Sequence, residues 1–257
     1  MIARRWGSDT AQSFFIHTDL LKSRSIFFKN FLPSIVRAND TKAEEFDGYS
    51  TYHTGLFWRQ EKLSITPVFE FPTESADAFE NYVQLLYTGA LPIQDLPAKP
   101  NADGDILSAW KEALCDAVHQ TCSALYKLYA LCTRIGDNTS KRVLLAAFLK
   151  QASTLRSNGT VYRPDKFAIA NVYDNTAAKD PLRMFLVDCY VYEGTSDWVY
   201  EAGEKSKHPP AFLADFMSVM LERRATPDYA SRLTDAKFYQ DMLRALEEGI
   251  GRGEEKK

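Results

Sequence analysis

The first candidate for chemistry is a histidine near the start of the chain that is followed closely by an aspartate and by serines. His17 lies two residues before Asp19, and Ser23 or Ser25 could complete a serine-type triad. The surrounding pattern, however, predicts that His17 ends a strand, where its ring can bond to nearby backbone, and nothing orients a hydroxyl nucleophile towards it. We therefore predict a structural role for His17 and no catalytic residue in this segment.

The second candidate is a group of cysteines and a histidine that could bind a metal ion. Cys115, His119 and Cys122 fall at positions i, i+4 and i+7 of one predicted helix, and Cys132 could supply a fourth ligand. Structural zinc sites usually take their ligands in close pairs from tight turns, and a single straight helix cannot surround a tetrahedral ion. Alanine, leucine and valine are interleaved on the same face. We therefore predict buried thiols, a hydrogen-bonded histidine and no metal site.

The glycines do not support a nucleotide site. Gly7, Gly89 and Gly136 each stand alone at a predicted turn, and the sequence contains neither a dinucleotide fingerprint nor a P-loop. We therefore expect no cofactor.

Composition and charge limit the class of protein. The chain of 257 residues is 45% hydrophobic, 13% aromatic and 25% charged, which is ordinary for a folded protein. Its net charge of −3 provides no basic excess for neutralising phosphates, which argues against direct nucleic-acid binding. The longest apolar run, Val143 to Leu149, is far shorter than the ~20 residues that span a bilayer. With no secretory signal and few cysteines, these features predict a soluble intracellular protein with reduced thiols, in the cytoplasm, the nucleus or both.

The elements that must position these residues begin with a predicted hairpin, in which strands over 2–6 and 13–17 flank a polar turn. Thr18 or Asp19 can cap the next helical turn, and Ser23 or Ser25 can cap a helix that carries the phenylalanines at 27 and 28. The polar, aperiodic residues 38–62 predict a long loop. A strand is predicted over 63–71, and Pro67 within it indicates an edge or a bulge.

The rest of the chain is predicted to be helical. Ser75 begins a helix that Gly89 ends, and a further pattern from 106 to 136 is long enough that we expect a break near 121–123. A turn at Asn158 and Gly159 follows. Helices are predicted over 139–155, 164–175, 180–193 and 210–224, with an amphipathic stretch after Pro227. The fold class is therefore α+β and mostly helical, with a small sheet flanked by helices and an all-α C-terminal extension.

Two dense motifs carry a family resemblance. Residues 14–28 resemble the BTB/POZ signature, and residues 79–89 resemble the family's next landmark, an apolar helix that closes in Tyr-Thr-Gly. Residues 125–131 are similar to the family's paired C-terminal helices, and residues 172–192 are similar to the helical extension of fungal BTB proteins. The fingerprint residues, to which the resemblance assigns a structural role, are Phe14, His17, Leu20, Leu21, Ser25, Phe28, Phe79, Tyr82, Leu86, Tyr87 and Gly89.

The resemblance implies a division of the chain and a function. It implies a BTB/POZ-like domain over 1–155 with a long insert at 38–62, a helical extension over 156–226, and an amphipathic helix with a charged flexible tail over 227–257. Its implied function is protein–protein interaction, through self-association or as an adaptor or scaffold. Because the sequence begins almost at the first core strand, we expect a monomer or a weak homodimer rather than a strand-exchanged dimer.

One short pattern suggests a particular partner. Trp110-Lys111-Glu112 matches the apolar-x-Glu pattern with which some BTB domains bind a cullin ubiquitin-ligase scaffold, so Trp110 and Glu112 are candidate partner-binding residues.

Two alternatives remain open. One is a transcriptional regulator that acts through recruited partners. The other is an enzyme whose site lies under the 38–62 loop or between the helical layers, and a pocket with converging ionisable groups of perturbed pKa would favour it.

Overall fold

The structure divides the chain into two compact units, which are described separately below. Unit 1 comprises Met1–Pro92 with Lys127–Ser140, and unit 2 comprises Ile93–Tyr126 with Lys141–Lys257. These units do not coincide with the predicted segments 1–155, 156–226 and 227–257. The computed structural model describes residues 2–4, 13–30, 57–59, 68–70, 75–91, 93, 96–101, 103–199, 208–225, 237 and 239–245.

Unit 1 contains a small sheet of four short strands in the order β2-β1-β4-β3. Strand β1 pairs antiparallel with β2 and parallel with β4, which in turn pairs antiparallel with β3. The pairing of β1 with β2 confirms the predicted N-terminal hairpin. The strands are β1 (Ile2–Arg4), β2 (Ser13–Phe15), β3 (Phe57–Arg59) and β4 (Val68–Glu70).

Two predictions about this sheet were wrong. Strand β3 lies within 38–62, which the sequence predicted to be loop throughout; the rest of that segment lies outside the described residues. Strand β4 lies between β1 and β3, so the edge position that Pro67 suggested was wrong, while the alternative, a bulge at Pro67, lies outside the described residues. The strand begins at Val68, directly after the proline in sequence, so its described residues can all donate to the ladder.

The first helix of unit 1, α1 (Thr18–Arg24), has His17 as its N-cap residue. Thr18 lies inside the helix and His17 makes no side-chain capping bond, so the predicted cap was wrong. Ser25, in contrast, is confirmed as a cap, because its Oγ accepts the backbone N–H of Phe28 at 3.2 Å.

Helix α3 (Ala76–Thr88) forms as the sequence predicted. Ser75 Oγ accepts the backbone N–H of Ala78 at 3.1 Å, and Gly89 ends the helix with φ +68°. Phe79 and Tyr82 lie on its buried face. Tyr87, a fingerprint residue near the end of the same helix, is 47% exposed.

Helix α4 (Asp105–Ile135) is continuous through 121–123, so the predicted break was wrong. No glycine or proline occurs there to interrupt the backbone hydrogen bonds. The chain then turns at Gly136, with φ +67°, into α5 (Asn138–Ser157). A Cβ at Gly136 would lie 3.3 Å from Cβ of Ile26, so both the backbone angle and the close packing favour glycine.

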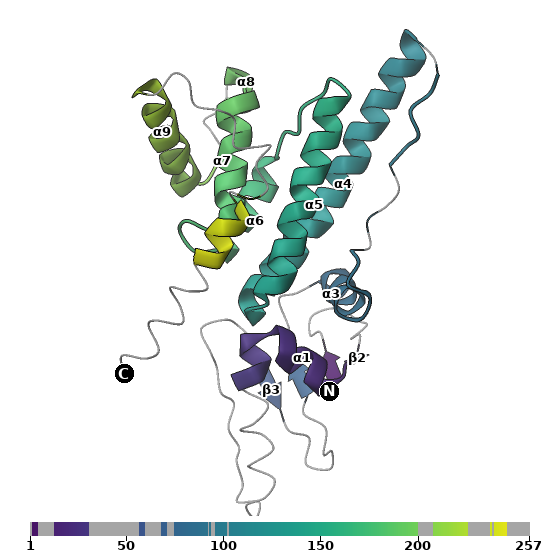
Figure 1. Cartoon of the computed structure of the whole chain (residues 1–257), viewed down its shortest axis with the longest axis vertical. Helices are drawn as coiled ribbons and strands as arrows, with labels where there is room; N and C mark the ends of the chain where they lie inside the picture. Colours follow the sequence, from purple (N-terminus) through teal and green to yellow (C-terminus); the bar gives the residue numbers. More distant parts are fainter. Residues whose placement is uncertain are drawn as a thin grey trace, which may run out of the picture. The chain divides into compact units, whose positions relative to one another are not determined.

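Unit 2 also contains the C-terminal helices (Figure 1). Helix α7 packs against α6 and α9, and its residues from Phe185 to Tyr190 are all buried, so it forms the centre of this layer. In the same unit, the ring of Tyr126 on α4 stacks on Phe148 of α5 with centroids 4.6 Å apart, and Phe148 in turn lies 6.1 Å from Phe185 of α7. These helices are α6 (Lys166–Asn175), α7 (Pro181–Glu193), α8 (Ser196–Val199), which was not predicted, and α9 (Pro210–Ala225).

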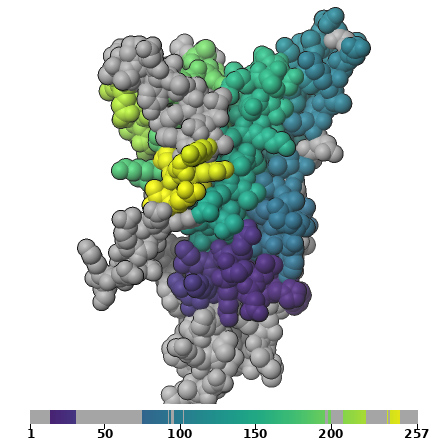
Figure 2. All heavy atoms as spheres, viewed as in Figure 1, coloured from purple at the N-terminus to yellow at the C-terminus, as the bar shows by residue number. Residues whose placement is uncertain are grey.

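The stretch after Pro227 is described only at 237 and 239–245, where it is helical. This segment lies at the surface in Figure 2 (yellow), but Tyr239 and Leu243 point inward and are buried. The rest of the amphipathic stretch predicted after Pro227 lies outside the described residues.

Helices make up most of the described residues, which confirms the mostly helical class. None of the helices in the described part of the chain combines the length and apolar composition needed to cross a bilayer.

Candidate functional site

The two segments that carry the fingerprint meet in unit 1. The rings of Phe14 and Phe79 lie 5.1 Å apart, and Nδ1 of His17 lies 2.7 Å from the Tyr87 hydroxyl. The same hydroxyl accepts the backbone N–H of His17 at 3.1 Å, so it can donate its own hydrogen to Nδ1. His17 therefore bonds a tyrosine side chain rather than the backbone that the sequence suggested.

The serines near His17 have other partners. Ser23 Oγ donates to the carbonyl of Leu20 at 2.7 Å, and Ser25 Oγ donates to that of Ile135 at 2.5 Å. A serine-type triad has no geometric support among these residues.

The remaining fingerprint residues divide between interior and surface. Leu20 is half-buried, and Gly89 is exposed. Those that are fully buried are Leu21, Ser25, Phe28, Phe79, Tyr82 and Leu86.

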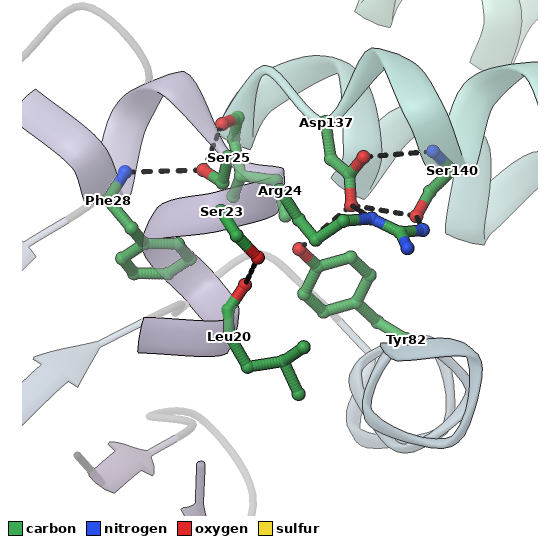
Figure 3. A network of polar contacts seen from close by, with 9 residues as sticks. Leu20, Ser23, Arg24, Ser25, Phe28, Tyr82, Asp137 and Ser140 are labelled. Atoms are coloured by element: carbon green, nitrogen blue, oxygen red, sulfur yellow. Dashed lines mark hydrogen bonds and ion pairs between the residues drawn. The ribbon is translucent and has the colours of Figure 1, made fainter. Parts of the chain in front are cut away.

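A buried polar network joins α1, α3 and the turn between α4 and α5 (Figure 3). At its centre the Asp137 carboxylate, with 0% exposure, accepts the Tyr82 hydroxyl at 3.2 Å and the Ser140 hydroxyl at 2.7 Å. It also accepts the backbone N–H of Ser140 at 2.9 Å, as an N-cap residue of α5 does. The Arg24 guanidinium lies 3.8 Å from the carboxylate and donates to Ser140 Oγ at 3.2 Å.

The chemistry of this network is structural. Burial, and secondly the negative charge of Asp137, raise the pKa of the Tyr82 phenol above its ordinary value, so the hydroxyl stays protonated and donates. A carboxylate with several donors and no exposure offers no reactive lone pair to a substrate. Sequence reasoning missed Asp137, although an aspartate directly after Gly136 and before a helical pattern is a typical N-cap signal.

Unit 2 contains a pocket of about 370 Å³. Its walls come from α4, from the short segment before α6 together with the first turn of α6, and from α7 and α8. His208, two positions before α9, completes the described lining. The lining residues are His119, Arg163, Pro164, Asp165, Lys166, Phe167, Tyr190, Trp198, Val199 and His208.

Hydrogen bonds hold the backbone of one pocket wall in place. Nε2 of His119 lies 2.9 Å from the carbonyl of Arg163, and the Tyr190 hydroxyl donates to the carbonyl of Pro164 at 3.0 Å. A third bond joins Nε2 of His208 to the carbonyl of Trp198 at 3.1 Å. These contacts fix the backbone at Arg163, Pro164 and Trp198 on the described part of the pocket wall.

The Tyr190 hydroxyl and the His119 imidazole of the pocket both lie against backbone carbonyls. Burial raises the pKa of the Tyr190 phenol, while the nearby Arg163 opposes the shift, so this hydroxyl is a stable donor. His119 faces carbonyl oxygens with both ring nitrogens, since Nδ1 lies 2.8 Å from the carbonyl of Cys115. Each contact is a hydrogen bond only when the nitrogen concerned carries hydrogen.

The cysteines that suggested a metal site lie in separate environments. Cys122 is buried beside Tyr162, Cys115 is half-buried, and Cys132 belongs to unit 1. Among the described residues, no group of three or more His, Cys, Asp or Glu side chains is placed to hold a metal ion. Burial raises the pKa of the Cys122 thiol to about 12, which keeps it protonated at neutral pH.

The candidate partner-binding residues differ in exposure. Trp110 is half-buried, its indole N–H donates to the carbonyl of Pro97 at 3.0 Å, and the Lys99 ammonium lies 5.9 Å from its ring centroid. Glu112 is exposed. The indole thus holds a loop of its own unit in place, while the carboxylate faces solvent.

Comparison of the chain with protein-family models, curated proteins and solved structures finds no match. A function for this chain therefore has to be inferred from the geometry of unit 1 and of the unit 2 pocket.

Proposed function

We propose that this chain is a protein–protein interaction protein built on a BTB/POZ-like core, which acts through self-association or as an adaptor. The observation that carries the proposal is that the two fingerprint segments, far apart in sequence, contact each other through Phe14 with Phe79 and through His17 with Tyr87. Residues that form one family motif are expected to meet in this way.

The sheet of unit 1 supports the same proposal. A short hairpin, β1 and β2, has a third strand, β4, parallel to β1, and helices follow it in the chain order that the resemblance implies. The Ser25 and Asp137 hydrogen bonds then join α1 and the start of the next helical segment to the turn between α4 and α5.

Exposed apolar side chains on unit 1 supply a means of association. Phe15 is 73% exposed, and Ile26 and Tyr87 are each close to half exposed. Burying such side chains against a second surface is favourable by about 25 cal/mol per Å² of apolar area, and a few aromatic anchors usually carry most of the affinity.

Self-association is tested by size-exclusion chromatography with light scattering over a range of concentrations. The wild type should shift towards a dimer at high concentration, and Phe15→Ser should remove that shift. Phe167→Ser is the matched control, because Phe167 is 74% exposed but lies in unit 2. A wild type that stays monomeric at every concentration, or equal loss in both variants, contradicts self-association through unit 1.

The adaptor form of the proposal predicts binding to a cullin scaffold that depends on Glu112. In a pull-down, Glu112→Ala should weaken capture, while Glu80→Ala, an exposed glutamate on α3, should not. Trp110→Ala is a poorer test, because the indole also bonds to Pro97. Absence of capture by the wild type would end the cullin version.

The unit 2 pocket bears on the enzyme alternative. It gathers ionisable groups, as a catalytic site would, but its imidazoles hold backbone carbonyls and its tyrosine is a protonated donor. These features favour ligand binding over catalysis.

A further inference from the structure

We infer that the unit 2 pocket binds a small aromatic anion, a single ring that carries a phosphate or a carboxylate. The proposal is independent of the BTB-like function, because it rests on residues of unit 2 alone.

The charge of the lining favours an anion. Among the described lining residues, Arg163 and Lys166 are cations, three positions apart in the chain, and Asp165 is the carboxylate. Asp165 is already engaged, because its Oδ1 accepts the backbone N–H of Ala168 at 2.7 Å as the N-cap of α6. The side chains described around the pocket therefore include more cations than carboxylates, which favours an anionic ligand.

The geometry of the arginine suits anion recognition. Its guanidinium carbon lies over the Trp198 ring, 5.6 Å from the ring centroid, as in a cation–π contact. Hydrogen bonds from a guanidinium to phosphate or carboxylate use the N–H groups at its edge. The backbone beneath it is held by His119 and Tyr190, so the position of the cation is preorganised.

The remaining lining favours an aromatic body. Trp198 and Tyr190 form part of the wall, and Phe167, 74% exposed, stands at the entrance with the Lys166 ammonium 5.6 Å from its ring centroid. Rings that already face cations can pack against a further ring by its edge or face. A volume of about 370 Å³ is at the small end of ligand pockets, which fits one ring with its anionic group.

The test uses phenyl phosphate as the probe, with calorimetry for affinity and the Trp198 indole N–H resonance in NMR for location. The resonance is assigned from Trp198→Phe. Phenyl phosphate should bind and shift the Trp198 resonance. Benzyl alcohol and inorganic phosphate should each bind at least tenfold more weakly. A tyrosine-phosphorylated peptide tests whether the ring can come from a protein. Tighter binding of the peptide than of phenyl phosphate supports the same chemistry with a protein source; tighter binding of phenyl phosphate supports a free small molecule.

Two cation variants decide the proposal. Lys166→Met and Arg163→Met should each weaken phenyl phosphate binding at least tenfold, while Lys150→Met, an exposed lysine on α5 outside the pocket, should leave it unchanged. Circular dichroism melting identifies any variant that fails to fold, and the half-buried, more peripheral Lys166 keeps the test available if Arg163→Met does. The proposal is overturned if the folded wild type does not bind phenyl phosphate at millimolar concentration, if benzyl alcohol binds equally well, or if Lys166→Met binds as the wild type does.

Discussion

The Asp137 network and the unit 2 pocket contain similar residues, but the first is a buried structural cluster and the second lines a cavity. Each gathers a tyrosine, an arginine and an acidic N-cap residue, Asp137 before α5 and Asp165 before α6. In the network the carboxylate is fully buried and accepts several donors, whereas Asp165 is exposed and lies beside a cavity of about 370 Å³.

The difference lies in what the polar groups face. Around Asp137 the Tyr82 hydroxyl, the Ser140 hydroxyl and the Ser140 backbone N–H all donate to the same carboxylate, so the arrangement ties chain segments together. In the pocket the bonds of the tyrosine and histidines are directed at backbone carbonyls, so they fix the wall and leave cations and rings around a space. Residue type alone does not distinguish a structural cluster from a binding site; the direction of the hydrogen bonds does.

The largest effect should come from removing the centre of the network. Asp137→Ala leaves the Tyr82 and Ser140 hydroxyls without their common acceptor, leaves the Arg24 guanidinium without its nearby carboxylate, and removes the cap of α5. We expect a loss of roughly 3–5 kcal/mol in the free energy of unfolding, measured by urea denaturation. Asp116→Ala, an exposed aspartate on α4, is the control and should change stability by less than about 0.5 kcal/mol. Similar losses in the two variants would show that the network does not stabilise unit 1.

A second contrast between sealed and open environments lies along α4. Because burial raises the pKa of Cys122 from 9.0 to about 12, its thiolate fraction near pH 8 should be lower by roughly a thousandfold than that of an unperturbed thiol. Alkylation followed by mass spectrometry should therefore modify the half-buried Cys115 first. Modification of Cys122 at the rate of Cys115 in the folded protein would contradict the assigned environment.

The same shift has a consequence for stability against pH. The folded state holds the Cys122 proton more tightly than the unfolded chain, so this contribution is fully present below about pH 9 and is lost as the pH rises towards 12. Cys122→Ala should show a smaller loss of stability over that range than the wild type. An equal loss in both proteins would assign alkaline destabilisation to other groups.

A smaller effect is expected from one hydroxyl of the network. Tyr82→Phe keeps the buried ring and removes one donor to Asp137, while the bonds from Ser140 remain. The expected loss is about 1–2 kcal/mol in the free energy of unfolding. Tyr87→Phe is the matched control, because that tyrosine is 47% exposed and its hydroxyl bonds to the exposed His17 in competition with water. A cost for Tyr87→Phe equal to that for Tyr82→Phe would remove the distinction between sealed and open hydroxyls.

The elements predicted correctly from the sequence are those whose ends carry capping residues. Ser75 and Gly89 bound α3 and Asp180 caps α7, because cap residues act through local hydrogen bonds that a pattern can identify. Where local preference was weak the prediction failed. The expected break in α4 rested on length alone, and β3 forms in a polar segment because it pairs with β4, which no local pattern records.

The candidate sites follow the same division. The motif segments suggested that Phe14, His17, Phe79 and Tyr87 belong together, and the structure brings them into contact. The pocket was not predicted, because its lining comes from positions between 119 and 208 that share no periodic pattern. Only the tertiary packing of α4, α6, α7 and α8 brings these residues around one space.

The smallest effect on stability should come from the entrance of the pocket, and it separates binding from folding. Phe167 is 74% exposed, so Phe167→Ser removes little buried area and should change the free energy of unfolding by less than about 0.5 kcal/mol. The same substitution removes a ring that lines the pocket and should weaken phenyl phosphate binding severalfold. Combined calorimetry and urea denaturation of this one variant therefore tests the comparison directly. Lost stability with unchanged binding would mean that Phe167 belongs to the core and that the pocket resembles the Asp137 network more than the hydrogen-bond directions indicate.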